Sequence, residues 1–428
     1  MSATSRAGAP TRCALPSPAS LGVTRDEVHL TRGRANTLRL ALSGQLPGAL
    51  TSDAVAEAMD LCVSCKGCKR DCPTGVDMAR MKIEVQAARV AKHGLSLRDR
   101  LVGYLPRYAP LAARWPGLAN LRNEKPRLRH LSERYAGLSA RRSLPRWRAD
   151  AWREPARLPG ADNARGVVFF ADTFNRYFEP ENIEAALGVL TAAGYGVHLA
   201  KPVDGSSRPL CCGRTFLAVG LVDEARREAE RCVAALAPLL ARGLPVVGLE
   251  PSCILGFRDE LLALVKSEDA RALASNALLF EEFLAREAAA GTLKLELKPV
   301  AKRALLHGHC HQKAFGAMGA AETVLGLVPE LAVETVESSC CGMAGAFGYG
   351  ADTIDASLKM AELSLLPAVR KAQADTLVLA DGTSCRHQIK DGTGRDALHV
   401  ARVLAMSLNP SGVGAGMTPD FVSDSAPA

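Results

Sequence analysis

The distribution of apolar residues along the chain changes near residue 166. Beyond this point, short apolar runs rich in Val, Leu and Phe alternate with amphipathic stretches of helical length. Such runs are typical of buried parallel strands, and their alternation with helices is typical of α/β proteins. The predicted strands lie at 166–172, 194–200, 243–253, 303–310, 331–339 and 375–385.

This second part of the chain repeats itself. Each copy reads strand, helix, strand, Cys-Cys-Gly, helix, strand and Cys, which indicates an internal duplication. The first copy covers 166–290 and the second covers 300–408, and we expect each Cys-Cys-Gly to begin a helix. Ligands of open α/β sheets bind at the carboxyl ends of the strands. Because the cysteines fall there, the pattern predicts one rim that carries the thiols.

The earlier residues follow a helical pattern instead. Ser52 is a suitable N-cap for the second of three predicted helices, and Gly94 is suited to end the third. These helices predict an all-helical, ferredoxin-like module over 28–94. The predicted helices lie at 37–44, 53–61 and 77–93.

The remaining segments differ in composition. Prolines and arginines punctuate 95–160, which is predicted to be a helical basic linker. We expect 1–27 and 409–428 to be disordered. The chain carries a formal net charge of +8, and basic residues concentrate at 122–153 without any nucleic-acid-binding motif. We therefore expect no nucleic-acid partner, and interpret the basic stretch as a solvated linker or a docking face for an acidic partner.

Three features of the sequence indicate where in the cell the protein is located: the membrane-spanning run and the signal segment that it lacks, and the clustering of its cysteines. No apolar run approaches the length of about eighteen residues that a membrane-spanning helix needs, and no hydrophobic segment follows the start of the chain. The 13 cysteines are clustered, which in a chain of this length indicates metal or redox chemistry in a reducing compartment. We expect a cytoplasmic protein, and a peripheral association with the inner membrane stays open.

Four cysteines fall within eleven positions and form the pattern C-x2-C-x2-C-x3-C-P. Bacterial ferredoxins hold a cubane 4Fe–4S cluster with this pattern, and the fourth cysteine normally ligates a neighbouring cluster. Gly67 is expected to let the backbone curl closely around the sulfides. Zinc and a disulfide pair are the alternatives, although zinc sites favour two separated pairs. The cysteines are Cys62, Cys65, Cys68 and Cys72.

A second set of cysteines belongs to the duplicated part. The second copy offers four thiols and the first copy three, because 171–175 contains no cysteine. The glycine after each Cys-Cys pair is expected to permit close approach to a cofactor. A second iron–sulfur cluster and zinc are both open, and the first copy is either degenerate or binds zinc or a substrate. Buried structural cysteines are the plainer alternative. The thiols are Cys310, Cys340, Cys341 and Cys385 in copy two, and Cys211, Cys212 and Cys253 in copy one.

Three histidines bracket Cys310 in the sequence. His307, His309 and His311 alternate along a predicted strand end, so they are expected to share one face. One of them could bind a metal or donate to a cluster sulfide, and a structural hydrogen bond is an equal alternative for each.

Four further residues have expected roles outside the ligand sets. Asp381 and Arg386 flank Cys385 and are candidates to tune the local charge. We interpret Cys232 as a structural cysteine and Cys13 as a free thiol.

Three motifs in this order resemble the C-terminal iron–sulfur half of large FAD-linked dehydrogenases that oxidise D-2-hydroxy acids such as D-lactate or D-2-hydroxyglutarate. The motifs are TRGRAN at 31–36, CVSCKGCKRDCPTGVDMARMK at 62–82 and the two Cys-Cys-Gly repeats. The same parts are similar to the iron–sulfur subunit of glycolate oxidase. They are also similar to the cysteine-rich subunits of heterodisulfide and anaerobic glycerol-3-phosphate enzymes. The resemblance covers about residues 24–405.

The resemblance implies an oxidoreductase subunit that acts on CH–OH donors. It implies a cubane cluster on the first four cysteines and matches the other seven to the family's Cys-Cys-Gly positions. The 165 residues before the first copy leave no room for a flavin domain, so FAD is expected on a partner chain. Electrons would pass from that flavin to a quinone, a cytochrome or another acceptor. The alternatives are a heterodisulfide-reductase-like catalytic subunit that reduces a disulfide or quinone, and a non-enzymatic metal-binding scaffold.

One departure from the family pattern concerns Cys72. The family has a second ferredoxin motif just upstream of TRGRAN, where this chain offers only Cys13. Either Cys72 closes the first cluster itself, or the chain is a truncated or split form whose missing half lies on a partner.

Overall fold

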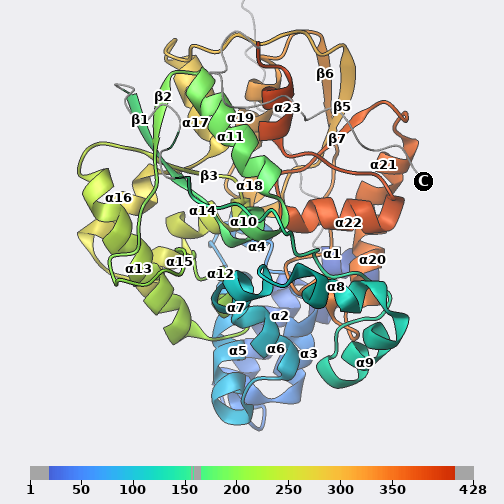
Figure 1. Cartoon of the computed structure of the whole chain (residues 1–428). Coiled ribbons are helices and arrows are strands. Elements are labelled where there is room, and N and C mark those ends of the chain that lie inside the picture. The colour runs from blue at the N-terminus through green and yellow to red at the C-terminus, as the bar shows by residue number, and fades with distance from the viewer. Residues whose placement is uncertain (1–18, 156–157, 159–164, 410–428) are drawn as a thin grey trace, which may run out of the picture.

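Figure 1 shows a computed structural model of the chain, in which residues 19–155, 158 and 165–409 are described. Most of the two segments expected to be disordered, and Cys13, lie outside the described residues. The end of the first segment is not disordered, because Ala19–Thr24 forms helix α1 and packs against α20 (Ile354–Glu362).

The first part of the chain folds into short helices around a small apolar core. Ser52 caps α3 by accepting a hydrogen bond from the Val55 amide, as predicted, and α5 ends before Gly94, as predicted. The helix predicted at 37–44 begins earlier, at Thr31. The elements are η1 (Glu27–His29), α2 (Thr31–Leu42), η2 (Ala49–Thr51), α3 (Asp53–Asp60), α4 (Gly67–Asp71) and α5 (Met78–His93). The ferredoxin-like character of this module stays a prediction.

The segment that contains the basic stretch folds into short helices, and one of its arginines is turned inward. Three of its helices carry a proline in their first two residues, a position where proline favours helix formation. Arg122 is turned inward and donates to the carbonyl oxygens of Ser139 (2.6 Å) and Arg142 (2.7 Å). The helices are α6 (Leu97–Gly103), α7 (Leu105–Ala112), α8 (Pro116–Glu124) and α9 (Pro126–Ala136).

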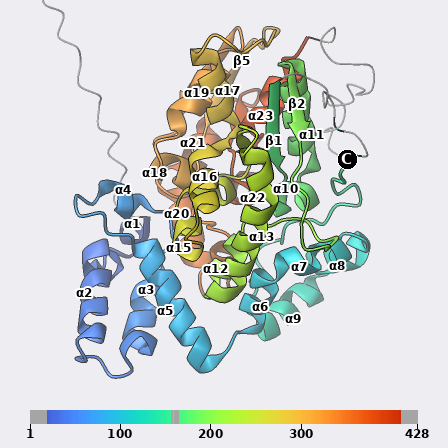
Figure 2. The same ribbon diagram turned by 90° about the vertical axis from the view of Figure 1, so that its left-hand side faces the viewer.

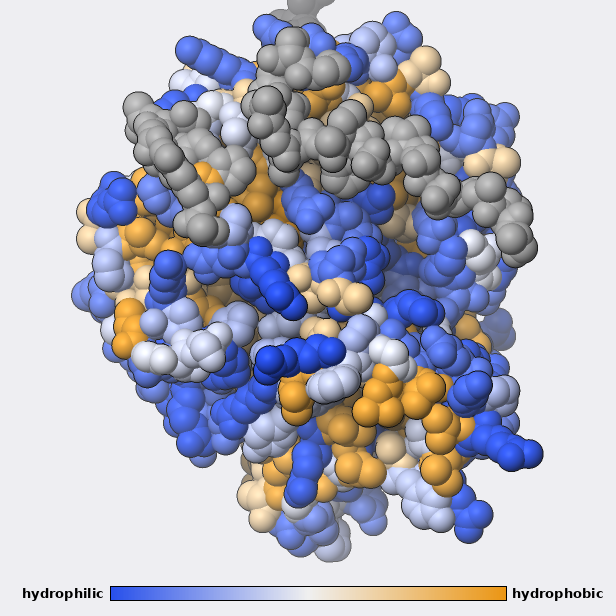
Figure 3. All heavy atoms as spheres, in the orientation of Figure 1, coloured by the Kyte–Doolittle hydropathy of each residue, from blue (hydrophilic) through white to orange (hydrophobic). Residues whose placement is uncertain are grey.

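The outer face of this stretch is partly apolar. Figure 3 shows apolar side chains gathered over the region of α7, α8 and α9, and the exposed apolar residues there include Leu111, Trp115 and Leu118. These three residues precede 122–153, so both interpretations of that basic stretch stay predictions. Among the described helices, none is both long enough and apolar enough to cross a bilayer.

Each repeat contains a parallel sheet. The first sheet has the order β2-β1-β3-β4 and the second has the order β6-β5-β7. A parallel bridge between Leu379 and Leu398 stands in the second repeat where β4 stands in the first. The strands are β1 (Arg165–Phe170), β2 (Tyr195–His198), β3 (Val246–Gly248), β4 (Ala277–Leu279), β5 (Lys302–Leu306), β6 (Leu331–Thr335) and β7 (Leu377–Leu379).

The helices between the strands complete the two repeats. In the first repeat they are α10 (Thr173–Phe178), α11 (Pro180–Ala192), α12 (Arg214–Ala218), α13 (Val222–Leu240), α14 (Pro251–Arg258), α15 (Glu260–Leu264), α16 (Glu268–Asn276) and α17 (Phe280–Ala289). In the second repeat they are α18 (Cys310–Ala314), α19 (Met318–Leu325), η3 (Phe347–Tyr349), α20, α21 (Leu365–Lys371), α22 (Thr383–Thr393) and α23 (Val400–Met406).

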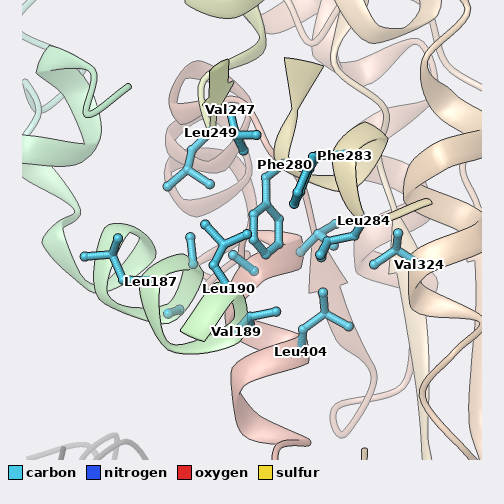
Figure 4. Packing of buried hydrophobic residues seen from close by; sticks show 14 of the residues in the cluster. Leu187, Val189, Leu190, Val247, Leu249, Phe280, Phe283, Leu284, Val324 and Leu404 are labelled. Atoms are coloured by element: carbon cyan, nitrogen blue, oxygen red, sulfur yellow. The ribbon is translucent and has the colours of Figure 1, made fainter. Parts of the chain in front are cut away.

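The two repeats share one apolar core. Helix α11 packs on α23, and α17 packs on α19. In each pair, a helix of one copy packs on a helix of the other copy that is not its own counterpart. Figure 4 shows Leu190, Phe280, Val324 and Leu404 meeting in this core. The arrangement is that expected of a duplicated unit related by an approximate two-fold axis. The helical module lies at one end of the paired repeats, as Figures 1 and 2 show.

Candidate functional site

The first cysteine motif forms an irregular loop between α3 and α4. Residues 62–66 have no regular structure, and Ser64 and Lys66 adopt left-handed φ values of 51° and 60°. Gly67, by contrast, is the first residue of α4. The tight curl predicted for Gly67 therefore comes from two non-glycine residues, and such conformations persist only where the surrounding structure holds them.

Three thiols of the motif lie near one another. Cys62 and Cys68 belong to the same small apolar cluster. Burial raises the pKa of Cys65 to about 12, with further contributions from the nearby thiols of Cys310, Cys62 and Cys68. The backbone N–H of Met78 points at Cys68 Sγ (3.4 Å) and opposes the rise in that thiol's pKa. The loop thus supplies both grouped sulfurs and N–H groups directed at sulfur, which are features of iron–sulfur sites.

Cys72 occupies a different environment. It is the C-cap of α4, is half-exposed, and its Sγ lies 3.1 Å from Thr74 Oγ1. The hydrogen bond with Thr74 lowers the pKa of Cys72. The predicted fourth ligand is thus more open to its surroundings than Cys62, which is buried.

Lys66 anchors the cysteine loop to the first repeat. Its side chain is 1% exposed, and Nζ lies 2.6 Å from Asp259 Oδ2, 3.0 Å from Glu260 Oε1 and 3.4 Å from Asp77 Oδ2. Burial lowers the pKa of Lys66, but the neighbouring carboxylates outweigh it and the net shift is upward. The loop is therefore fixed by a buried ion-pair network in which each charge has a partner.

The three cysteines that were predicted at strand ends lie on helices. Cys310 is the first residue of α18, Cys253 is the third of α14 and Cys385 is the third of α22. The strands stop earlier than predicted because polar residues after each apolar run cap the following helix, as His309 and Glu250 do.

The two Cys-Cys-Gly segments lead into different structures. In the first copy α12 begins directly after Gly213, as predicted. In the second copy α20 begins only at Ile354, so the prediction that Gly342 precedes a helix was wrong. The intervening turns include η3, which leaves a longer loop beside the second thiol pair.

Both glycines of these segments share a conformation and a hydrogen bond. Gly213 and Gly342 have φ of 81°, and their N–H groups lie 3.4 Å from Sγ of Cys211 and Cys340. A Cβ at Gly342 would stand 2.3 Å from the carbonyl oxygen of Ser357 on α20. Glycine is thus required here for the turn and for helix packing. The sequence analysis expects the same glycines to permit close approach to a cofactor.

The thiols of the second repeat form a chain of contacts. Cys340 interacts with Cys310 and Cys341, and Cys341 interacts with Cys385. The ligand atoms of His307, Cys341 and Cys385 lie within 4.8 Å of one another, and all three residues are buried. Among the described residues, no other three His, Cys, Asp or Glu side chains approach so closely. Zn–S and Zn–N bonds of about 2.0–2.3 Å make this spacing suitable for one metal ion.

His307 has the hydrogen bonding of a metal ligand. Its Nδ1 lies 2.9 Å from Ser338 Oγ, while Nε2 is buried and has no hydrogen-bond partner among the described residues. Burial, together with Lys313, lowers the pKa of His307 to about 4, so the ring is neutral at physiological pH. A ligating histidine is usually held in this way through its second nitrogen.

The other two histidines do not share that face. His309 caps α18, and its Nδ1 accepts a hydrogen bond from the His311 amide (3.2 Å). His311 Nε2 lies 3.1 Å from the carbonyl oxygen of Ser64 in the first cysteine loop. The expectation of one common face was wrong because α18 begins between these residues and changes the period from two to 3.6.

Two sulfurs of the second repeat are favoured as thiolates. A hydrogen bond from Cys340 lowers the pKa of Cys310 to about 6, although burial opposes it. Hydrogen bonds from Cys340 and Cys385 lower the pKa of Cys341 well below its usual value. Nearby, Lys313 Nζ donates to the carbonyl oxygens of Ser338 (2.5 Å) and Ser339 (3.2 Å).

Lys313 was missed by the sequence analysis. Its side chain is buried, and burial lowers its pKa; the four neighbouring thiols oppose this shift, but the net direction is downward. The only available signal was its position one helical turn after Cys310, which places it on the same side of α18.

The three thiols of the first repeat lie close together, and this repeat has no fourth cysteine among them. Cys212 interacts with Cys211 and Cys253, and all three thiols have raised pKa values. The hydrogen bond with Cys212 lowers the pKa of Cys253, but burial and the nearby charges of Asp172 and Glu250 together raise it to about 12. Thr173, the first residue of α10, stands where Cys310 stands in the second repeat. A cavity of about 10 Å³ adjoins Cys212 and Cys253, which is room for a single small species.

Three candidate residues have structural partners. Arg386 Nε lies 2.6 Å from Glu179 Oε1, and Asp381 Oδ2 accepts a hydrogen bond from Gln312 (2.7 Å). Buried Cys232 donates to the Cys211 carbonyl oxygen (3.1 Å), which agrees with a structural role.

The first cysteine loop meets the second repeat directly. Cys65 packs in the same apolar cluster as Cys340, and the nearby Cys310 thiol raises the pKa of Cys65. Segments about 250 residues apart in the chain are thus placed side by side, as α4 and α18 also show. Arg214 connects the thiols of the first repeat to this contact, because its guanidinium lies 3.5 Å from His311 Nε2 and near Cys212.

Comparison with known proteins gives relatives of one enzyme class. The chain is 26% identical to D-2-hydroxyglutarate dehydrogenase of Escherichia coli, over 90% of this chain and 41% of that protein. It is 27% identical to one subunit of the anaerobic glycerol-3-phosphate dehydrogenase of the same organism, over 73% of this chain and 78% of that subunit. The D-2-hydroxyglutarate dehydrogenase of Pseudomonas putida is 27% identical over 89% of this chain and 40% of its own length. No family model matches the chain.

These relatives confirm part of the predictions. By name they are dehydrogenases, which agrees with the enzyme class that the resemblance implies. Two of the enzymes named in the resemblance are among them. The chain spans only about two fifths of the D-2-hydroxyglutarate dehydrogenases it matches. The other relative is by name one subunit of a larger enzyme.

Proposed function

We propose that this chain is the iron–sulfur electron-transfer component of an FAD-linked 2-hydroxyacid dehydrogenase of the glycolate, D-lactate or D-2-hydroxyglutarate type. The observation that carries the proposal is the contact between the two cysteine-bearing parts. Cys65 packs against the apolar cluster that contains Cys340, and His311 Nε2 lies 3.1 Å from the carbonyl oxygen of Ser64. Two redox sites built there would be adjacent, which is what a relay of electrons through one chain requires.

The residues of the first loop fit a cubane 4Fe–4S cluster. Cys62, Cys65 and Cys68 are grouped, but their three sulfurs do not all lie within 4.8 Å of one another, as the ligand atoms of His307, Cys341 and Cys385 do. A single zinc ion needs its thiolates about 4 Å apart, whereas a cubane places each thiolate on a different iron and needs a wider spacing. Cys72 is the fourth ligand in this proposal. When bound, the cluster supplies one-electron transfer.

The second repeat would hold a second metal centre. Cys310, Cys340, Cys341 and Cys385 are its thiol ligands, and the free Nε2 of His307 is available beside them. Lys313 provides a buried positive charge close to these thiols, which favours a site of net negative charge. The first repeat, with Cys211, Cys212 and Cys253, offers three ligands and is the candidate for zinc.

The other parts of the enzyme lie on other polypeptides in this proposal. A separate FAD-binding chain removes a hydride from the hydroxy acid, and a quinone, a cytochrome or another acceptor receives the electrons. The relative that is a subunit of a larger enzyme supports a divided organisation of this kind. We place the protein in the cytoplasm, with peripheral attachment to the inner membrane when the acceptor is a quinone.

A second candidate function rests on the second repeat alone. The close group of His307, Cys341 and Cys385 could bind a metal that itself takes part in reducing a disulfide or a quinone, as in heterodisulfide-reductase-like proteins. This alternative needs no flavin on a partner.

Turnover assays separate the two candidates. The chain is purified anaerobically and mixed either with reduced FMN or with D-2-hydroxyglutarate, and its visible absorbance is followed. We expect reduced FMN to bleach the protein and the hydroxy acid alone to leave it unchanged. Oxidation of a hydroxy acid by the isolated chain would contradict the proposal. Steady-state reduction of a disulfide by the isolated chain would favour the alternative.

A further inference from the structure

A pocket of about 360 Å³ lies away from the cysteines, where the basic stretch meets the second repeat. Its polar lining comes from α9, from the extended segment that follows it, and from α22, which lie next to α20 in Figure 1. The polar residues are Arg129, Arg141, Arg142, Ser143 and Asp391. Three guanidinium groups are offset by two carboxylates, Asp391 in the lining and Asp355, which pairs with Arg141, so a net positive charge remains.

Two of these guanidinium groups keep buried N–H groups without a partner. Arg142 is 3% exposed; its Nε lies 3.1 Å from Asp391 Oδ2, and its Nη2 has no hydrogen-bond partner among the described residues. Arg129 donates from Nη2 to the carbonyl oxygen of Asn123, while its buried Nε is also unpartnered in this part of the chain. A buried N–H group without a hydrogen-bond partner lowers the stability of the folded protein. An anion can accept charge-assisted hydrogen bonds from both arginines and so remove this cost.

The remaining lining indicates the size and shape of the ligand. Arg141 is largely exposed and pairs with Asp355 on the pocket rim (2.6 Å), so its guanidinium can turn toward a ligand. Ile354 and Leu358 provide an apolar side. We propose that this pocket binds a small organic dianion, a dicarboxylate or a phosphate ester, whose charged groups pair with the three arginines and whose carbon atoms contact the apolar side.

The pocket is connected to the second thiol pair. Arg142 Nη1 lies 2.9 Å from Met343 Sδ and 3.0 Å from the carbonyl oxygen of Gly348, at the two ends of the loop that follows Cys340-Cys341-Gly342. An anion on the other nitrogen of the same guanidinium fixes the side chain that holds this loop. Binding in the pocket therefore stabilises the loop beside the thiols.

Titration calorimetry on the full-length protein tests the binding. The probes are inorganic phosphate, glutarate and, as a monoanion control, butyrate, at constant ionic strength. We expect saturable binding of phosphate, glutarate or both, and none of butyrate. Arg129→Gln and Arg141→Gln each weaken binding by about tenfold, the effect of losing one charge-assisted hydrogen bond. Arg127→Gln is the matched control, because it removes the same charge from an exposed position of α9 outside the pocket.

The outcomes are distinct. Binding of phosphate alone identifies a phosphate ester as the ligand class, and binding of glutarate alone identifies a dicarboxylate. Absence of binding of both anions overturns the proposal, as does an equal loss in Arg127→Gln, which would indicate general surface charge. Hydrogen exchange of the segment 343–349 tests the connection, since a bound anion slows exchange in the wild type and not in Arg141→Gln. Unchanged exchange in the wild type would refute the connection to the thiols.

Discussion

Lys66 Nζ lies 2.6 Å from Asp259 Oδ2, although the two residues are 193 positions apart in the chain. Lys66 stands between two cysteines of the first loop, and Asp259 begins the turn between α14 and α15 of the first repeat. On its other side the loop meets the second repeat through the contact between Ser64 and His311. The loop is therefore positioned by both repeats, and its geometry depends on their being correctly folded and paired.

Replacement of Lys66 tests this anchoring. Lys66→Met removes the buried cation. The two carboxylates keep other partners, which are Lys69 and Arg80 for Asp259 and Arg214 for Glu260. We therefore expect the free energy of unfolding to fall by less than the cost of an uncompensated buried charge, which is about 3–5 kcal/mol. Lys92→Met is the control, because Lys92 is exposed on α5 and contacts only Thr51 Oγ1 (3.1 Å). A Lys66→Met protein as stable as the Lys92→Met protein would contradict the anchoring role.

Replacement of His307 tests the second metal centre. His307→Ala removes the nitrogen ligand while leaving the four thiols in place, so the metal bound at the second repeat should be lost more readily to a chelator. We expect the affinity for the metal to fall at least tenfold. Loss of a residue that only hydrogen-bonds to a metal ligand already lowers metal affinity by about 10–100-fold. His387→Ala serves as the control, since its ring pairs with Tyr349. Equal metal retention in both variants would exclude His307 as a ligand.

Asp172 should make stability depend on pH. Burial, reinforced by Glu250, raises the pKa of Asp172 to about 6 from 3.8. Between these values the folded protein keeps a proton that the unfolded chain releases, so the free energy of unfolding falls as pH rises from about 4 to 6 and then levels off, by about 3 kcal/mol in total.

The Asp172→Asn variant isolates this contribution. Asparagine keeps the oxygen that caps α10 by accepting from the amides of Phe174 and Asn175, but it does not titrate. Thermal midpoints of both proteins are measured in the same buffers, so that other titrating groups cancel. The wild type should lose stability relative to Asp172→Asn over this range. A difference that stays constant with pH would show that the pKa of Asp172 is not raised.

The sequence predicted the elements that depend on local pattern. The helix at 77–93 with its glycine stop, the Ser52 cap and the parallel strands all follow from residues close in the chain, and the structure agrees with each. Ends of strands were placed too late, as at Cys310, because a capping histidine was interpreted as part of the strand. The internal duplication was also visible in the sequence. The packing of α11 on α23 and of α17 on α19 was not, because it depends on which apolar faces of the two copies meet.

The candidate site divides in the same way. Cysteine spacing alone was enough to group Cys62 with Cys65 and Cys68. The partners that position these residues, such as Asp259 for Lys66 and Ser338 for His307, come from distant segments and leave no local signal. The same holds for Lys313, whose partners are the carbonyl oxygens of Ser338 and Ser339 and the thiols around it.

The central claim is that the first loop holds an iron–sulfur cluster, and metal analysis of matched cysteine variants tests it most directly. Iron and acid-labile sulfide are measured per chain, with electron paramagnetic resonance of the reduced protein, for the wild type, Cys65→Ser and Cys232→Ser after anaerobic purification. Cys232 is a buried cysteine hydrogen-bonded to the Cys211 carbonyl oxygen, so its variant controls for the loss of a thiol. We predict that Cys65→Ser loses about four iron and four sulfide ions and the signal of one cluster, while Cys232→Ser matches the wild type. Unchanged iron content and an unchanged signal in Cys65→Ser would contradict the account.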